Sequence, residues 1–419
     1  MKTSRLPGFY KMNIEERRRI LKEFANLTDE EIKLLDNGLE ISLADKMVEN
    51  VVGTIQIPLG IAVNFRINGK DYLIPMATEE PSVIAAASHA AKLALPDGFI
   101  AESTDSIMRG QIQVLNVSNP EKAINELLKY KFELIDRANS FVKSLVTVGG
   151  GVRDLNARIV GPKEDEMLIV EFFVDCKDAM GANTVNTIVE KMAPYIESIT
   201  EGKVLLRILS NLATERIARA RVVYKRSVIG EDVVENIIKA YKLAYYDVYR
   251  ATTHNKGIMN GIIAVALATA NDTRAIEAGA HAYASLSGRY LPLSKWYKNK
   301  EGDLVGELEL PLAVGTVGGA IGANPIAKLC LKILGIKTSK ELAEVMCSVG
   351  LAQNFAALRA LVTEGIQRGH MELHARNIAI MAGAKGDLID KIAEILVKED
   401  KITIERAKEI LESIKNNSQ

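Results

Sequence analysis

Cysteine is scarce in this chain, which has three among 419 residues: Cys176, Cys330 and Cys347. They are widely separated, odd in number, and never in the CxxC spacing of a zinc or dithiol site. This usage is typical of small buried side chains in a reducing cytosol, where disulfides are rare. The alternative that one of the three cysteines is a catalytic nucleophile stays open.

An excess of charge is also missing. The chain has 53 basic and 53 acidic residues, for a formal net charge of zero. Without a basic block, bulk binding to a nucleic-acid backbone is disfavoured. The N-terminal residues mix Lys, Arg and Glu, unlike a secretory signal. The apolar runs look shorter than the about 20 residues of a membrane span. We therefore expect a soluble, cytoplasmic protein.

The length and composition indicate a globular protein of two or three domains. A chain of 419 residues with 48% hydrophobic and 25% charged residues can bury a large core. Near the N-terminus, cap residues followed by acids predict helices from Asn13 and Thr28. Strands are expected over 53–63 and 70–77, joined through an Asn68-Gly69 turn, before an Ala-rich helix from Ser82.

Residues 106–210 have a pattern of their own. Strand and helix periodicities there alternate in the order β-α-β-β-α-β, which is typical of a ferredoxin-like domain. The expected elements are a strand 107–117, a helix 121–146, strands 152–160 and 167–174, a helix 183–200 and a strand 204–209. After Gly369, a Gly383–Gly386 loop and two short amphipathic helices predict a small mobile appendage.

A lysine and an amide stand four residues apart in the segment that begins at Arg250. If residues 256–270 are helical, Lys256 and Asn260 share one face, and a cation held there suits the stabilisation of an oxyanion. Asp272 then has two interpretations. It tunes the charge of Lys256, or it caps a helix that starts at Thr273.

Two glycine clusters are candidate phosphate-binding loops. Gly181, in Asp178-Ala-Met-Gly-Ala-Asn-Thr-Val-Asn186, stands between a predicted strand and a helix, where free N–H groups and the helix dipole favour a diphosphate. A packed strand-to-helix turn is the alternative. No GxGxxG occurs, so a Rossmann site is not supported. The cluster Gly315–Gly322 is either a second cradle or a tight backbone crossing.

Three further side chains have possible chemistry. Glu80, beside Glu79, becomes a proton donor if burial raises its pKa, although adjacent acids are usually solvated. His370 and His374 have the spacing of two zinc ligands on a helix. Their order is not HExxH and no third ligand is near, so metal is not expected and a solvated pair is the simpler alternative.

Taken in order, these motifs resemble those of class II hydroxymethylglutaryl-coenzyme A (HMG-CoA) reductases, the soluble bacterial and archaeal form. The resemblance runs from Ser4-Arg-Leu-Pro7 to the C-terminal helices. Its motifs are Glu49-Asn-Val-Val-Gly53, Glu79-Glu-Pro-Ser82, Asp178-Ala-Met-Gly181, Arg250–Asp272, Leu351-Ala-Gln-Asn-Phe355 and Gly365–His374.

The resemblance implies an α+β fold in three parts. Residues 1–105 and 211–369 form a large, mostly helical domain for substrate and coenzyme A, 106–210 an inserted ferredoxin-like, non-Rossmann NAD(P) domain, and 370–419 a C-terminal helical flap. The implied reaction is the reductive deacylation of HMG-CoA to mevalonate and coenzyme A, with two NADPH or NADH per turnover and no metal. An obligate homodimer, in some members assembled further, is implied as well.

The resemblance also implies residue roles. The catalytic group is Glu80, Lys256, Asp272 and His370, in which Lys256 stabilises the oxyanion, Glu80 supplies a proton, Asp272 tunes both and His370 protonates the coenzyme A thiolate. The substrate-binding group is Ser82, Asn211, Arg250, Asn260, Glu49, Asn50 and Gly53. The cofactor-binding group is Asp178, Met180, Gly181, Ala182, Asn183, Asn186, Val142, Lys143, Gly318 and Gly319.

Two other classes of function remain open. One is a thioester enzyme that works through a cysteine, which is disfavoured because none of the three cysteines lies beside a motif histidine. The other is a non-catalytic coenzyme A scaffold. A scaffold would tolerate the loss of Lys256, Glu80 or His370, and the presence of all three disfavours this class. Oxidation of a reduced nicotinamide in the presence of HMG-CoA distinguishes the three.

Overall fold

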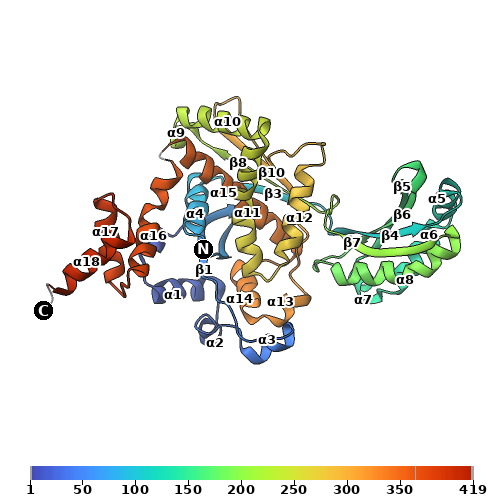
Figure 1. Cartoon of the computed structure of the whole chain (residues 1–419), viewed down its shortest axis with the longest axis horizontal. Helices are drawn as coiled ribbons and strands as arrows, with labels where there is room; N and C mark the ends of the chain where they lie inside the picture. The colour runs from blue at the N-terminus through green and yellow to red at the C-terminus, as the bar shows by residue number, and fades with distance from the viewer. Residues whose placement is uncertain (1, 364, 417–419) are drawn as a thin grey trace.

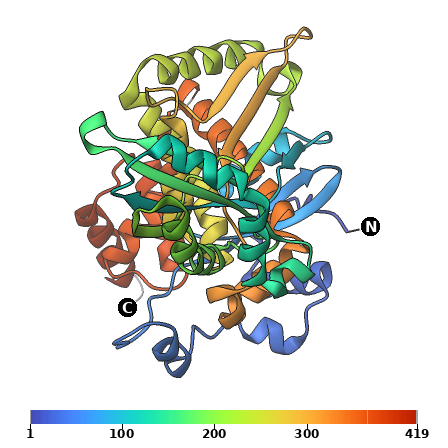
Figure 2. The same ribbon diagram turned by 90° about the vertical axis from the view of Figure 1, so that its right-hand side faces the viewer.

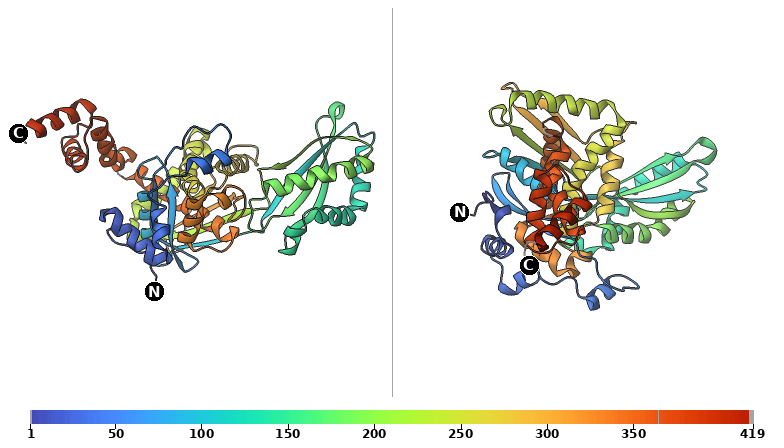
Figure 3. Two further views of the ribbon diagram at one scale, coloured as in Figure 1. Left: turned by 90° about the horizontal axis from the view of Figure 1, so that it is seen from below. Right: turned by 60° about the vertical axis from the view of Figure 1, so that its left-hand side comes forward.

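The structure is a computed structural model that describes residues 2–363 and 365–416, with side chains through 363, at 365 and over 374–414. It has three parts (Figure 1). A central body lies between a four-stranded unit on one side and three C-terminal helices on the other, and the view from below shows the same order (Figure 3). This α+β architecture confirms the expected fold class.

A six-stranded mixed sheet forms one layer of the central body. Its order is β2-β1-β3-β8-β10-β9, with β1 and β3 parallel and the other neighbours antiparallel. The strands are β1 (Leu59–Ile67), β2 (Lys70–Ala77), β3 (Phe99–Ser103), β8 (Ile217–Tyr224), β9 (Ser294–Lys298) and β10 (Leu304–Pro311). The sequence predicts only two strands in this body, so its sheet content is larger than expected.

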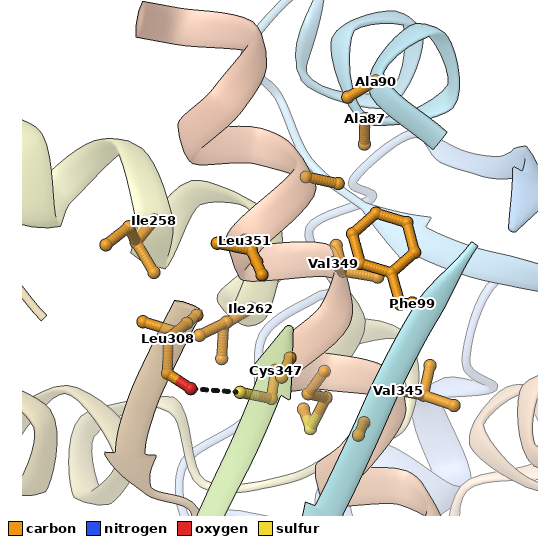
Figure 4. Packing of buried hydrophobic residues seen from close by; sticks show 14 of the residues in the cluster. Ala87, Ala90, Phe99, Ile258, Ile262, Leu308, Val345, Cys347, Val349 and Leu351 are labelled. Carbon is orange, nitrogen blue, oxygen red and sulfur yellow. Dashed lines mark hydrogen bonds between the residues drawn. The ribbon is translucent and has the colours of Figure 1, made fainter. Parts of the chain in front are cut away.

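Helix α15 (Ser339–Val362) is the centre of the core. It packs against α4 (Val83–Leu93), α10 (Glu231–Tyr246), α11 (Val248–Ala268) and strands β3, β8 and β10. Figure 4 shows Cys347, Val349 and Leu351 of α15 among Phe99 and Ile262, and the Cys347 thiol lies 3.6 Å from the carbonyl oxygen of Leu308. The sheet and the helices therefore share one core, which α15 fills.

The length and hydropathy of α15 correct one expectation from the sequence. Among the described residues, it is the one helix long and apolar enough to cross a membrane, although the sequence analysis found no run of that length. Its apolar window is 67% buried inside the protein. Burial of most of the helix explains the composition, because a helix that packs into a core is apolar around most of its circumference.

Small residues bring α11 close to α15. A Cβ atom at Gly261 would lie 3.0 Å from Val349 Cγ1, and one at Gly350 would lie 2.8 Å from Ile262 Cδ1. The two glycines remove the side chains that would otherwise separate the helices. Helix α11 is thereby held rigidly against the core, and its opposite face is free to carry functional groups.

The second sheet has the strand order β5-β6-β4-β7, all antiparallel. Its elements follow the chain as β4 (Ile107–Leu115), α5 (Pro120–Lys129), α6 (Lys131–Ser140), α7 (Lys143–Thr147), β5 (Gly151–Val160), β6 (Met167–Asp175), α8 (Ala182–Thr200) and β7 (Lys203–Ser210). This is the ferredoxin-like strand order. The single helix expected over 121–146 is three helices, because the backbone leaves helical geometry at Tyr130 (ψ 11°) and Val142 (ψ 44°). Figure 2 looks onto this unit, which has a separate hydrophobic core.

The C-terminal helices α16 (Ile366–Met381), α17 (Leu388–Lys398) and α18 (Ile404–Asn416) also have their own core. Ala375, Ala379, Ile392 and Leu396 are buried within it. These helices meet the central body mainly where α16 follows α15. Because α16 begins at Ile366, residue 370 lies inside a helix.

The N-terminal part begins with helices closed by side-chain caps. Capping boxes pair Asn13 with Glu16 and Thr28 with Glu31, as the sequence predicts. The strand expected over 53–63 is wrong in its first half, since β1 begins at Leu59. The remaining elements are η1 (Phe9–Lys11), α1 (Ile14–Ala25), α2 (Asp29–Lys33), α3 (Ile41–Met47), η2 (Lys163–Asp165), α9 (Arg226–Ile229), α12 (Thr273–Ala284), α13 (Gly319–Ala323) and α14 (Pro325–Leu334).

Candidate active site

Glu80, Lys256 and Asn260 meet on the free face of α11. The Lys256 Nζ lies 2.8 Å from Glu80 Oε2, and the Asn260 amide donates to Glu80 Oε1 at 3.2 Å. The carboxylate comes from the connection between β2 and α4, 176 residues earlier in the chain. A carboxylate bound by an ammonium and an amide can exchange a proton beside a fixed cation.

The local sequence explains why α11 presents these groups. Asp247 caps the helix by accepting from the backbone N–H of Arg250, so α11 starts eight residues before the helix expected at Lys256. Arg250 lies in its first turn, where partial burial lowers the pKa of the guanidinium. Lys256 and Asn260, four residues apart, share one face of α11. The expected i, i+4 arrangement is therefore present.

Ser82 is the most unusual residue beside this cluster. It is the N-cap of α4 with φ at 72°, in the left-handed region that side chains rarely adopt. Its hydroxyl is buried and has no hydrogen-bond partner within the described part of the chain. Backbone strain and an unpaired buried hydroxyl are typical of a ligand-binding position.

Asp272 lies beyond the C-terminal end of α11, directly before α12. Its carboxylate accepts from the N–H of Ala275 at 3.0 Å, which makes it the cap of α12, and it lies 4.0 Å from Arg274. Within the described residues, no ion pair links it to Lys256. The capping interpretation thus describes the geometry, and the tuning role remains a prediction. Asn211 is exposed, and its carbonyl oxygen packs against Gly279 of α12.

The Asp178–Asn186 loop leads from β6 into α8. Gly181 has φ at 104°, and a Cβ there would lie 2.3 Å from Cys176 Sγ, so only glycine fits. Asp178 accepts from the N–H of Ser339, the first residue of α15, at 2.8 Å. The loop is therefore fixed to α15 at its first residue, and it continues into the first turn of α8 at its other end.

The second glycine cluster lies directly against this loop. Thr316 donates its N–H to Asp178 O at 2.8 Å, and Val317 forms a parallel bridge with Ala179. Gly318 and Gly319, exposed and at positive φ, follow immediately. The segments 178–186 and 315–319, which are far apart in the sequence, thus form one glycine-rich surface. The motifs alone did not indicate that the two segments lie side by side.

Arg216 supports both loops and was not singled out from the sequence. Its guanidinium, 5% exposed, donates to Met180 O at 2.9 Å, to Ala179 O at 3.2 Å and to Val314 O. Burial lowers its pKa to about 10, which leaves the group charged at neutral pH. Only its position in the fold identifies it, because an isolated arginine has no sequence signature.

The other predicted residues differ in how the structure holds them. Within the cofactor group, Asn186 accepts from the N–H of Leu209 at 3.0 Å and Val142 is buried. The partly exposed or exposed members are Met180, Ala182, Asn183 and Lys143. Glu49, Asn50 and Gly53 are exposed in a segment without regular structure. His370 has a side chain outside the described ones, so its role stays a prediction.

The three cysteines are poor nucleophiles. All are buried, and burial raises the pKa of Cys176 and Cys330 to about 12 and that of Cys347 well above its ordinary value. Thiolate is the reactive form, so buried neutral thiols do not attack a thioester. Among the described side chains, no group of three could hold a metal ion.

Comparison with known proteins shows which family the chain resembles. The family described as hydroxymethylglutaryl-coenzyme A reductase matches residues 13–375. A reductase of that name from Archaeoglobus fulgidus is 58% identical over 99% of this chain and 95% of its own length. A probable reductase from Borreliella burgdorferi is 40% identical over 91% and 88%.

Solved structures of the class II reductase from Streptococcus pneumoniae are similar as well. One is 41% identical, covers 97% of this chain and 99% of its own, and has a TM-score of 0.84. Another, bound to NADPH in open conformations, is 43% identical over 85% and 99%, with a TM-score of 0.83. The fold and the relatives define an α+β oxidoreductase. The chain belongs to the hydroxymethylglutaryl-coenzyme A reductase family, which confirms the resemblance.

Proposed function

We propose that this oxidoreductase carries out its reaction at the Glu80–Lys256–Asn260 cluster. The reaction is the NAD(P)H-dependent reductive deacylation of HMG-CoA to mevalonate and coenzyme A. The contact of Lys256 with Glu80 at 2.8 Å is the observation that supports this location. A cation beside a carboxyl group supports the proposal, because reduction of a carbonyl needs a stabilised oxyanion and a proton donor.

The residues divide the chemistry between them. A reduced nicotinamide, when bound, supplies one hydride in each of two steps. Lys256 stabilises the oxyanion that forms on the thioester carbonyl and then on the aldehyde. After the first step the C–S bond breaks, and His370 gives the departing thiolate its proton. Glu80 protonates the alkoxide of the second step, which yields the mevalonate hydroxyl.

Substrate contacts are assigned to groups around this cluster. Arg250 binds the carboxylate of the hydroxymethylglutaryl group, since a guanidinium holds a carboxylate with two parallel hydrogen bonds. Ser82 supplies the buried hydroxyl that has no partner within the described chain. Asn211 and Asn260 add further polar contacts to the substrate. Asp272, at the start of α12, tunes the charges of Lys256 and Glu80.

The nucleotide is assigned to the glycine-rich surface formed by 178–186 and 315–319. Gly181 packs directly against Cys176, where a Cβ would lie 2.3 Å from the sulfur, and this close turn leads into the N-terminus of α8, whose free N–H groups suit a diphosphate. NADPH bound to the Streptococcus pneumoniae relative supports the same ligand here. The domain limits 1–105 with 211–369, 106–210 and 370–419 are part of this proposal, with the last part acting as a flap.

The enzyme is proposed to be a homodimer of the cytoplasm. Val52 and Ile55, in the segment that begins with the Glu49–Gly53 motif, are 100% and 93% exposed. Apolar side chains that are this exposed in one subunit are typical of a surface covered by another subunit. We place this segment at the subunit interface along the pantetheine arm of HMG-CoA.

Product stoichiometry tests the proposed function. Purified enzyme with HMG-CoA should oxidise two NADPH for each mevalonate formed, and a chelator should leave the rate unchanged. The loss of absorbance of the reduced nicotinamide gives the first quantity and chromatography of mevalonate gives the second. A ratio of one, or dependence on zinc, would contradict the mechanism. Absence of any oxidation would favour the coenzyme A scaffold.

A further inference from the structure

Asn271, between α11 and α12, holds the loop of the second glycine cluster at Gly315. Its amide accepts from the N–H of Gly315 at 2.7 Å and donates to the carbonyl oxygen of Gly315 at 3.2 Å. The side chain is buried, and its NH₂ group also bonds the hydroxyl of Thr269 at 3.0 Å. One amide thus satisfies both backbone groups of a single glycine, which fixes that glycine relative to α11.

Gly315 in turn presses against the 178–186 loop. A Cβ on Gly315 would lie 2.7 Å from Met180 N and 3.1 Å from Asp178 O, so the two backbones are in direct contact. The next residue, Thr316, donates its N–H to Asp178 O at 2.8 Å. Movement of Gly315 therefore moves the 178–186 loop, which is called the nucleotide loop below.

The other end of this connection is the catalytic helix. The N–H of Asn271 donates to Ala266 O in the last turn of α11 at 2.9 Å, and Ala270 is in the left-handed region with φ at 51°. Such a backbone keeps its shape only when its surroundings impose it. Lys256 and Asn260 lie on the same rigid helix. One connection from the helix that carries Lys256 to the 178–186 loop thus passes through the Asn271 amide, alongside the supports from Ser339 and Arg216.

We propose that Asn271 is a positioning residue that sets the distance between the hydride donor and the carbonyl carbon held at Lys256. The inference rests on the proposed function, because it assigns the nucleotide to the glycine-rich surface and the carbonyl to α11. Asn271 has no direct contact with the Glu80–Lys256–Asn260 cluster within the described residues. Its effect is on geometry, and a misplacement of about 1 Å costs on the order of 10²-fold in rate.

The test is Asn271→Asp, which keeps the size and the acceptor but places a carboxylate oxygen against the carbonyl of Gly315. We expect kcat to fall by about 10²-fold, while KM for HMG-CoA and for NADPH changes only a few-fold. Hydride transfer then limits the rate. NADPH carrying deuterium at the transferred position should therefore show a larger isotope effect on kcat than it does with the wild type.

Asn255→Asp is the matched control. Asn255, buried within α11, likewise holds a loop through its amide, which donates to Leu291 O at 2.9 Å and accepts from the N–H of Leu293 at 2.9 Å. No hydrogen bond in the described structure joins that loop to residues 178–186. Asn255→Asp should lower the melting temperature to a similar degree and leave the isotope effect as in the wild type.

Each outcome decides the proposal. An isotope effect in Asn271→Asp equal to that of the wild type overturns it, and so does an equal rise in Asn255→Asp, which would mean general loosening of α11. If Asn271→Asp does not fold, Asn271→Ser replaces it with the same criteria. A wild type that oxidises no NADPH with HMG-CoA contradicts the proposed function instead, so the two failures are distinct.

Discussion

Replacement of Lys256 by alanine separates catalysis from stability because the lysine is at the surface. Its side chain is 59% exposed and that of its partner Glu80 is 39% exposed. Exposed ion pairs of this kind contribute about 0–1 kcal/mol to folding. Alanine is also the best helix former, so α11 should persist. We therefore expect Lys256→Ala to unfold at a temperature close to that of the wild type.

The expected effect on the reaction is larger. Removal of one donor to a developing oxyanion costs about 10²- to 10³-fold in kcat, or about 2.7–4 kcal/mol. The loss of activity should therefore exceed the loss of stability several-fold in free energy. Lys256→Arg should restore little, because a planar guanidinium does not reproduce the compact charge of an ammonium.

The assay is the initial rate of NADPH oxidation with HMG-CoA at saturation, together with thermal unfolding of each variant. Lys298→Ala provides the control, since Lys298 forms an ion pair with Glu235 and both side chains are similarly exposed, at 45% and 43%. That variant should keep the kcat of the wild type. A normal kcat in Lys256→Ala with normal unfolding would mean that Lys256 is an ordinary surface lysine.

Three further results are expected. NADPH should be accepted at least as well as NADH, because Val142 and the exposed Lys143, both in the predicted cofactor group, present no acid that would repel a 2′-phosphate; a kcat/KM for NADH more than tenfold higher would refute this. His370→Gln should impair reduction of the thioester but largely spare reduction of free mevaldehyde, where no thiolate leaves, and equal loss of both half-reactions would withdraw the leaving-group role. N-ethylmaleimide at pH 8 should not inactivate the native enzyme, since burial keeps the pKa of Cys176 and Cys330 at about 12, whereas protein unfolded in urea should take up three equivalents; rapid inactivation with one equivalent bound would contradict the burial.

Local signals in the sequence identified the elements whose geometry is decided locally. The Asn68-Gly69 turn is an example, because both residues have positive φ, as a two-residue hairpin requires. The strand expected from residue 53 was wrong for the opposite reason. Ile55 and Ile57 alternate with polar residues, but no strand in the described part of the chain pairs with them, and both are exposed. Periodicity indicates which faces are apolar, and it does not supply a partner.

Long-range relations were beyond the reach of local patterns. Strands β8, β9 and β10 were missed: β8 pairs with β3, more than one hundred residues earlier in the chain, and β10 pairs with β8, so only the β9–β10 pairing is local. The contact of Glu80 with Lys256 was implied only by the family resemblance, and Arg216 and Asn271 carry no motif at all. Their roles depend on which backbone atoms the fold brings beside them.

The position of α15 along the chain has a consequence for synthesis. Its partners α4, α11, β3, β8 and β10 all precede it, so the ribosome completes the surrounding wall before the helix that fills it. Until Val362 has emerged, the inner face of the six-stranded sheet lacks its cover and exposes apolar side chains. The four-stranded unit, by contrast, is complete once Ser210 is made. Domains fold largely in the order of their synthesis, so this unit should form first, while the nascent central body remains the part that depends on protection from aggregation.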